Sequence, residues 1–185
     1  MRFFVLAGLV AVTAAAASTP ALAQARDDWS LGLSGGYASV GDLKVRPSGS
    51  RPLVARGLRG ASVSLGLDRV LLEGQSWRVS GGGELGYLHA DSDSVSDASG
   101  SAELSRTSGF AVVSVQRTAA FTQPFAGVGL GVIHDRLHLR TEGQDIVIGR
   151  TIPAAKAFAG VEWDTKPVAI GFSVGATGAF GKGPR

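Results

Sequence analysis

The sequence lacks cysteine entirely, which excludes disulfides, thiolate metal sites and a lipid-modified cysteine anchor. Charged residues are also scarce, at 18% against about a quarter in typical soluble domains. After residue 23 there is no run of about 18 apolar residues, so no transmembrane helix is predicted, and no long segment has a period of 3.6. Glycine is abundant instead, with 27 residues among 185, about twice the usual share of about 7%.

The first 23 residues have the three parts of a secretory signal peptide. Arg2 supplies an early positive charge, residues 3–12 are apolar, and residues 21–23 read Ala-Leu-Ala. This pattern predicts export and cleavage before Gln24, and the apolar run is too short to span a bilayer. The mature chain, residues 24–185, is expected to be one domain. It keeps 17 basic and 15 acidic residues, which are scattered, so no nucleic-acid partner is predicted.

Alternation of apolar and small or polar residues, with a period of two, dominates the mature chain. It predicts seven strands, at residues 29–37, 61–67, 77–87, 110–116, 124–132, 155–163 and 168–177. The predicted connections are long at 41–57, 91–107 and 135–153, and short at 68–76, 118–123 and 164–167. Long and short connections therefore alternate, as the extracellular loops and periplasmic turns of outer-membrane barrels do.

The stretch PFAGVGLGV, residues 124–132, shows which kind of barrel the alternation favours. Its apolar set is Val128, Leu130 and Val132, and glycine fills the positions between them. A soluble barrel would place Lys, Glu and Thr on its water-facing positions, whereas a narrow membrane barrel needs small residues inside. The sequence thus predicts an all-β, antiparallel, up-and-down transmembrane barrel, nominally of eight strands, of which seven are legible.

Aromatic residues at the strand ends support the membrane interpretation. The tryptophans fall at the predicted periplasmic ends and the two tyrosines at the opposite ends. We assign six residues to the two aromatic girdles: Trp29, Tyr37, Trp77, Tyr87, Phe125 and Trp163. From Trp77 to Tyr87 the ten steps cover roughly 26 Å of membrane normal, close to the apolar band of about 25 Å.

Together with the signal peptide, the stretches WSLGLSGGY, GGGELGYL and PFAGVGLGV resemble the small outer-membrane β-barrels of Gram-negative bacteria, the attachment and opacity type. The resemblance covers nearly all of the mature chain. It implies eight strands, an outer-membrane location and insertion by the barrel assembly machinery, which in many members reads a terminal aromatic residue. This sequence departs from the pattern, because the nearest aromatic residue, Phe180, lies five residues before the end. A missed strand, a truncated reading frame and an irregular last strand remain open.

No catalytic, cofactor-binding or metal-ligating residue is assigned. Residues 81–86 match G-x-G-x-x-G formally, but the alternation continues through them, whereas a dinucleotide site needs a helix there. Residues 91–97 cluster three aspartates without the spacing of a calcium loop. Lipid A-modifying barrels use a serine–histidine pair, yet His134 and His138 have no serine two residues away, and His89 forms no legible pair either. We therefore expect no enzymatic activity.

Four charged residues fall on the lumen-facing positions of two strands: Arg78, Glu84, Lys156 and Glu162. Unpaired charges are costly in a narrow lumen, so we predict an internal ion-pair network that plugs the barrel and fixes its register. The alternative is a narrow water path between the charges.

The sequence predicts an integral outer-membrane protein with a structural or surface-interaction role, most simply as a monomer. Its expected partners are outer-membrane lipid and lipopolysaccharide, because the mixed charges of RLHLRTEGQD and KVRPSGSRP suit lipid head groups. Three alternatives stay open: a small passive channel, a lipid A-modifying enzyme and a soluble periplasmic barrel.

Overall fold

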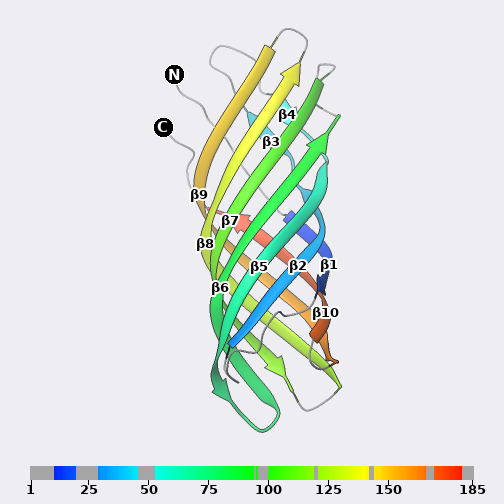
Figure 1. Cartoon of the computed structure of the whole chain (residues 1–185). Coiled ribbons are helices and arrows are strands. Elements are labelled where there is room, and N and C mark those ends of the chain that lie inside the picture. Colours follow the sequence, from blue (N-terminus) through cyan, green and yellow to red (C-terminus); the bar gives the residue numbers. More distant parts are fainter. Residues whose placement is uncertain are drawn as a thin grey trace.

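The chain folds into one closed barrel and a small two-stranded sheet (Figure 1). The structure is a computed structural model that describes residues 11–19, 29–45, 53–93, 95, 100–118, 121–141, 144–165 and 169–180. Among these residues, no helix is long and apolar enough to cross a bilayer.

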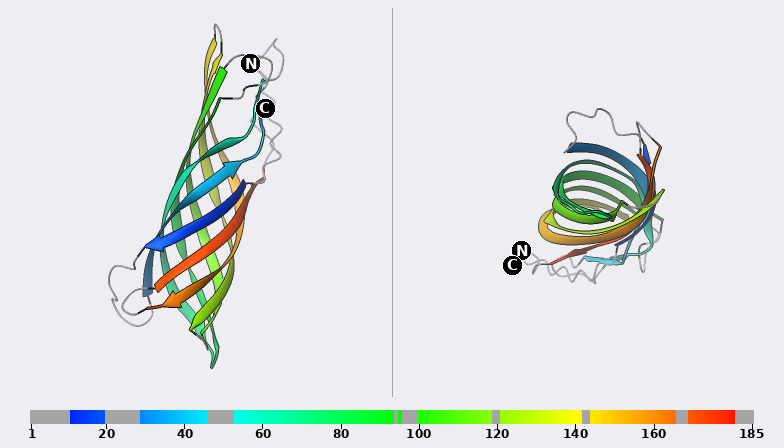
Figure 2. Two further views of the ribbon diagram at one scale, coloured as in Figure 1. Left: turned by 90° about the vertical axis from the view of Figure 1, so that its right-hand side faces the viewer. Right: turned by 90° about the horizontal axis from the view of Figure 1, so that it is seen from below.

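Eight strands, antiparallel to their neighbours, close the barrel in the order β1-β10-β9-β8-β7-β6-β5-β2. Their bounds are β1 Ala11–Thr19, β2 Trp29–Val40, β5 Leu58–Glu73, β6 Trp77–Ser92, β7 Gly100–Arg117, β8 Thr122–Thr141, β9 Gln144–Asp164 and β10 Ala169–Ala179. From β2 to β10 each barrel strand pairs with the next one in the chain, and the view along the axis in Figure 2 shows the resulting ring. The predicted fold class is therefore confirmed, although Val168, the first residue of the last predicted strand, lies outside the described residues.

The eighth strand comes from the N-terminal segment. β1 pairs with β10 on one side and with β2 on the other, in registers such as Val12↔Ala176 and Val12↔Ser39. It belongs to residues 1–23, which the sequence assigns to a signal peptide. The expected cleavage site before Gln24 lies outside the described residues and stays a prediction. A chain cut there would lose β1 and leave β2 and β10 without an intervening strand.

Two predicted long loops are wrong, because they are mostly strand. Within residues 91–107, β6 continues to Ser92 and β7 begins at Gly100. Within residues 135–153, β8 continues through Thr141, and β9 begins at residue 144. These strands run beyond the others at the upper end in Figure 1, and β9 pairs with β10 only from residue 154 onward. A curved sheet therefore projects from one end of the barrel.

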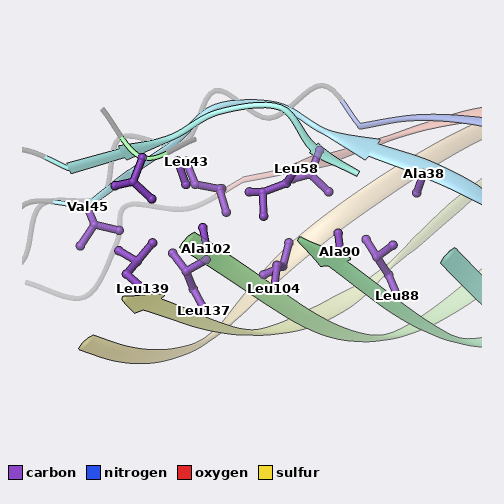
Figure 3. Packing of buried hydrophobic residues seen from close by; sticks show 13 residues of the cluster. Ala38, Leu43, Val45, Leu58, Leu88, Ala90, Ala102, Leu104, Leu137 and Leu139 are labelled. Atoms are coloured by element: carbon purple, nitrogen blue, oxygen red, sulfur yellow. The ribbon is translucent and has the colours of Figure 1, made fainter. Parts of the chain in front are cut away.

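A hairpin closes over the inner face of this projecting sheet. It consists of β3 Leu43–Val45 and β4 Leu53–Ala55, and Ala55 forms a bridge to Val95. Figure 3 shows apolar side chains of the hairpin facing those of the sheet. The buried residues of this cluster are Ala38, Val40, Leu43, Val45, Ala55, Leu58, Leu88, Ala90, Val95, Ala102, Leu104, Leu137 and Leu139. The predicted loop at 41–57 thus contains a structured hairpin.

Candidate functional site

Outward-facing residues of β6 to β9 form rows that run straight across the four strands. One row consists of the direct cross-strand partners Tyr87, Thr107, His134 and Thr151, and we call it the boundary row. The lower barrel is the part between this row and the strand ends at the tryptophans. The outer extension is the part beyond the row, toward the β8–β9 turn.

The outer face of β8 changes character at the boundary row. In the lower barrel, Val128, Leu130 and Val132 are 62%, 67% and 53% exposed. In the outer extension, the exposed positions are occupied by Arg136 and Arg140. Exposed aliphatic side chains on successive outward positions suit lipid, whereas arginines suit water or lipid head groups. The boundary row therefore marks the edge of a lipid-facing band.

The inner face of β8 makes the opposite change. Below the boundary row it presents Phe125, three glycines and the buried Ile133. Above the row it presents Asp135 and then the buried Leu137 and Leu139. The outer extension is thus apolar inside and polar outside, as a soluble domain is. This reversal explains why residues 91–107 and 135–153 were predicted as loops. Neither the inward-facing nor the outward-facing positions stay apolar along the whole strand, so the alternation is lost in the sequence.

Lumen glycines in β8 face the bulkiest lumen side chains of β9. Gly127 is the direct partner of Phe158, and Gly129 is the partner of Lys156. A Cβ atom at Gly127 would lie 2.3 Å from the Phe158 ring, and one at Gly129 would lie 3.1 Å from Lys156 Cγ. The alternating glycines of PFAGVGLGV therefore provide the room in which neighbouring large side chains fill the lumen.

Five of the six expected girdle residues lie on the outer face. Trp29, Tyr37, Trp77 and Tyr87 are exposed, and Trp163 is half-buried against Phe172 in an edge-to-face contact with ring centroids 5.9 Å apart. Phe125 is the exception.

The assignment of Phe125 to the girdle is wrong. Its ring lines the lumen and lies 6.2 Å from the Phe158 ring, centroid to centroid. The reason is its position in the alternation, because Phe125 falls in the same set as the lumen glycines of β8.

The four predicted lumen charges form two separate groups. Lys156 and Glu84 are joined directly by an ion pair, and the Lys156 ammonium also lies over the rings of Phe110 and Phe158. In the second group, Arg78 donates a hydrogen bond to Gln116.

Gln116 in turn links this group to the fourth charge, since its Nε2 donates to Glu162 Oε1 at 3.1 Å. Sequence reasoning missed Gln116 because only formal charges were considered. Its position in the alternation, shared with Phe110 and Ser114, places it in the lumen.

A buried charged triad lies inside the barrel at the base of the outer extension. Arg106, Asp135 and Arg150 are direct cross-strand partners on β7, β8 and β9, and their side chains are 6%, 3% and 11% exposed. Arg106 donates to both carboxylate oxygens, through Nε at 2.5 Å and Nη2 at 3.0 Å. Arg150 donates to Asp135 Oδ2 through Nε at 3.2 Å and Nη2 at 3.0 Å.

The triad was missed because its members fall in the segments interpreted as loops. Extending the strand alternation would have located it, since Asp135 is in phase with Gly131, and Arg150 with Lys156.

Below the triad the lumen holds a cavity of about 260 Å³. Its walls include Arg106, the Glu84–Lys156 pair and the rings of Phe110, Phe125 and Phe158. Small and apolar residues make up much of the remaining wall, together with five serines and one threonine: Ser34, Ser62, Ser64, Ser108, Ser173 and Thr177. The cavity therefore lies between the triad and the Glu84–Lys156 pair. The apolar cluster between the β3–β4 hairpin and the projecting sheet, which we call the apolar lid, lies in the outer extension.

The three histidines belong to the outer side of the extension and its base. His134 Nδ1 lies 2.8 Å from Thr151 Oγ1, His138 pairs with Asp145, and His89 Nδ1 lies 3.9 Å from Glu103 Oε1. Within the described ranges, no group of three or more His, Cys, Asp or Glu residues is arranged to hold a metal ion. Of the aspartate cluster, Asp97 lies outside the described residues.

Comparisons with known proteins find similarity to solved structures. No protein-family model and no curated protein matches the sequence. The crystal structure of the attachment invasion locus protein of Yersinia pestis is similar to this chain at 12% sequence identity, with a TM-score of 0.38. The match covers 97% of this chain and 99% of that one.

Proposed function

We propose that this chain is an integral outer-membrane β-barrel protein whose lower barrel anchors it and whose outer extension makes contacts at the cell surface. The observation that carries the proposal is the reversal of polarity at the boundary row. Lipid-facing valines and leucines below the row suit a bilayer, and the independently packed sheet above it is a stable surface for contact. The signal peptide that the sequence predicts in residues 1–23 and the resemblance of the sequence to outer-membrane barrels support this location.

The outer extension has an edge strand that could bind a partner. Over residues 144–153, β9 pairs with β8 but with no other described strand. This edge contains Ile146, Val147 and Ile148, and an edge strand with free N–H and C=O groups can add an extended segment of a partner. Lipopolysaccharide remains the proposed lipid partner, because the exposed Arg136 and Arg140 lie above the lipid-facing part of β8.

We propose a structural and binding role without catalysis, and with a closed lumen. Closure is supported by the aromatic rings and ion pair in the lower barrel, by the triad above them, and by the apolar lid. A passive channel is the second candidate, since the cavity of about 260 Å³ could belong to a water path. Single-channel conductance in planar bilayers separates the two, and a steady conductance would favour the channel.

Membrane fractionation combined with heat-modifiable gel migration tests the central proposal. We expect the protein in the outer-membrane fraction, with faster migration before heating than after. Protein that stays soluble without detergent would overturn the proposal. The intact mass of the same material shows whether residues 1–23 have been removed.

A further inference from the structure

The charges of the triad do not balance. Arg106 and Arg150 share the single carboxylate of Asp135, so the group carries a net charge of +1 while almost fully buried. Among the described residues, no second carboxylate lies within 4.0 Å of either arginine. A buried charge without a partner is unfavourable, because it has lost its hydration. A negative charge close to the triad would relieve this cost.

Arg106 lines the cavity and has unused hydrogen-bond donors. Its Nε and Nη2 atoms bind Asp135, which leaves Nη1 and the second N–H of Nη2 without an acceptor among the described residues. Nη1 is not among the buried polar atoms that lack a hydrogen-bond partner, so solvent reaches it. Arg106 also lines the lumen cavity. The free end of the guanidinium is therefore a fork of the kind that binds carboxylate or phosphate oxygens.

Hydroxyl groups surround the same space. Ser62, Ser108 and Thr177 line the cavity from β5, β7 and β10. Their hydroxyl groups make no hydrogen bond to another described residue, unlike those of Ser34 and Ser64, which bind each other. Ser108 lies two residues from Arg106 on the same face of β7. Donors that converge from several strands suit a tetrahedral anion, and a cavity of about 260 Å³ has room for one with bound water.

One other lumen carboxylate, Glu84, lines the same cavity, whereas Glu162 and Asp68 do not. Glu84 is held by Lys156, and Glu162 binds Gln116 at the opposite end. We propose that the lumen cavity below Arg106 is a binding site for one small inorganic oxyanion of the phosphate type. The anion accepts hydrogen bonds from the Arg106 guanidinium and the serine and threonine hydroxyls, and it neutralises the triad.

Equilibrium dialysis of the full chain in detergent micelles with radiolabelled inorganic phosphate, at constant ionic strength, tests the site. We expect saturable binding of one phosphate per chain. Arg106→Met should weaken it by roughly tenfold or more, the scale of one charged hydrogen bond. The matched control is Arg136→Met, on the exposed outer face of β8, which should leave the affinity unchanged. Absence of saturable binding, or equal loss in both variants, would overturn the proposal.

Two further measurements keep the test valid if Arg106→Met does not fold. Arg150→Met leaves Arg106 and Asp135 as a neutral pair, so phosphate binding should weaken although every donor to the anion remains. Crystals of the unchanged chain soaked in bromide should show anomalous density beside Arg106 Nη1. Density only at exposed arginines such as Arg136 would reject the lumen site. These readouts do not depend on surface contacts, so they can fail while the proposed function stands.

Discussion

The lower barrel and the outer extension use the same strands with opposite polarity. Below the boundary row, β8 directs Leu130 outward and Gly131 inward, whereas above it Arg136 points outward and Leu137 inward. Stability in the lower barrel therefore depends on filling a narrow lumen and matching lipid. In the outer extension it depends on burying a hydrocarbon core away from water. One continuous strand can thus pass from lipid into water, provided that the polarity of its inward-facing and outward-facing residues reverses at the membrane surface.

The largest expected effect comes from adding a side chain at a glycine of β8 that lies against the backbone of β7. A Cβ atom at Gly131 would lie 1.9 Å from the Gly109 carbonyl oxygen and 2.8 Å from Phe110 Cα. Gly131→Val should therefore cost about 3 kcal/mol or more and abolish the heat-modifiable folded form. Leu130→Val, on the lipid-facing side, is the control and should migrate like the original protein. Normal folding of Gly131→Val would contradict the close approach of the β7 backbone to Gly131.

Removing the shared carboxylate tests the junction between the two regions. Asp135→Asn leaves Arg106 and Arg150 buried side by side, so the free energy of unfolding should fall by about 3–5 kcal/mol. Urea titration in lipid vesicles measures the change. Asp91→Asn on the exposed face of β6 should stay within about 0.5 kcal/mol of the original protein. Similar values for the two variants would mean that the triad is not buried as described.

A matched pair of valines compares the two outer faces directly. Val128 and Val147 are 62% and 54% exposed, but Val128 lies mid-way along the lipid-facing band and Val147 lies in the outer extension. Val128→Arg should cost about 2–4 kcal/mol, because the arginine meets hydrocarbon. Val147→Arg should change the stability by less than about 0.5 kcal/mol. The same urea titration measures both changes in the free energy of unfolding. Equal changes would mean that the boundary row does not mark the edge of the membrane.

The smallest effect is expected at the ion pair of the lower barrel. Glu84→Gln removes the ion pair but leaves the cation–π contacts of Lys156 with Phe110 and Phe158. The free energy of unfolding should therefore fall by about 1–3 kcal/mol. Liposome swelling should stay unchanged, because the rings still fill the lumen. Faster swelling would support the water path instead. Unchanged stability together with unchanged swelling would show that the pair neither plugs nor braces the barrel.

The lower barrel was predictable from the sequence because its alternation is strict. Leu85 and Tyr87 alternate with Glu84 and Gly86, and each set keeps one environment over the whole span. The lumen pair of Glu84 and Lys156 followed from the same phase, although a one-dimensional pattern does not say which charges meet across strands. That depends on register and shear, which link residues 72 positions apart.

The outer extension and the triad could not be found in this way. Residues 135–153 mix charged and apolar side chains on both sets, since the sets exchange environments near His134. The eighth strand was missed for another reason. Residues 11–19 are rich in alanine and lack alternation, and their composition fits a signal peptide better than a strand.

The straight course of the boundary row has a consequence for the surrounding lipid. A cross-strand row lies perpendicular to the strands, and barrel strands are tilted by about 40°. With strands about 4.8 Å apart, the row from Tyr87 to Thr151 climbs by about 9 Å along the barrel axis. If the barrel axis stood along the membrane normal, the edge of its lipid-facing band would therefore be inclined to the plane of the head groups. The barrel can meet this slope in two ways: it leans in the bilayer, or the leaflet becomes thinner on one side of it.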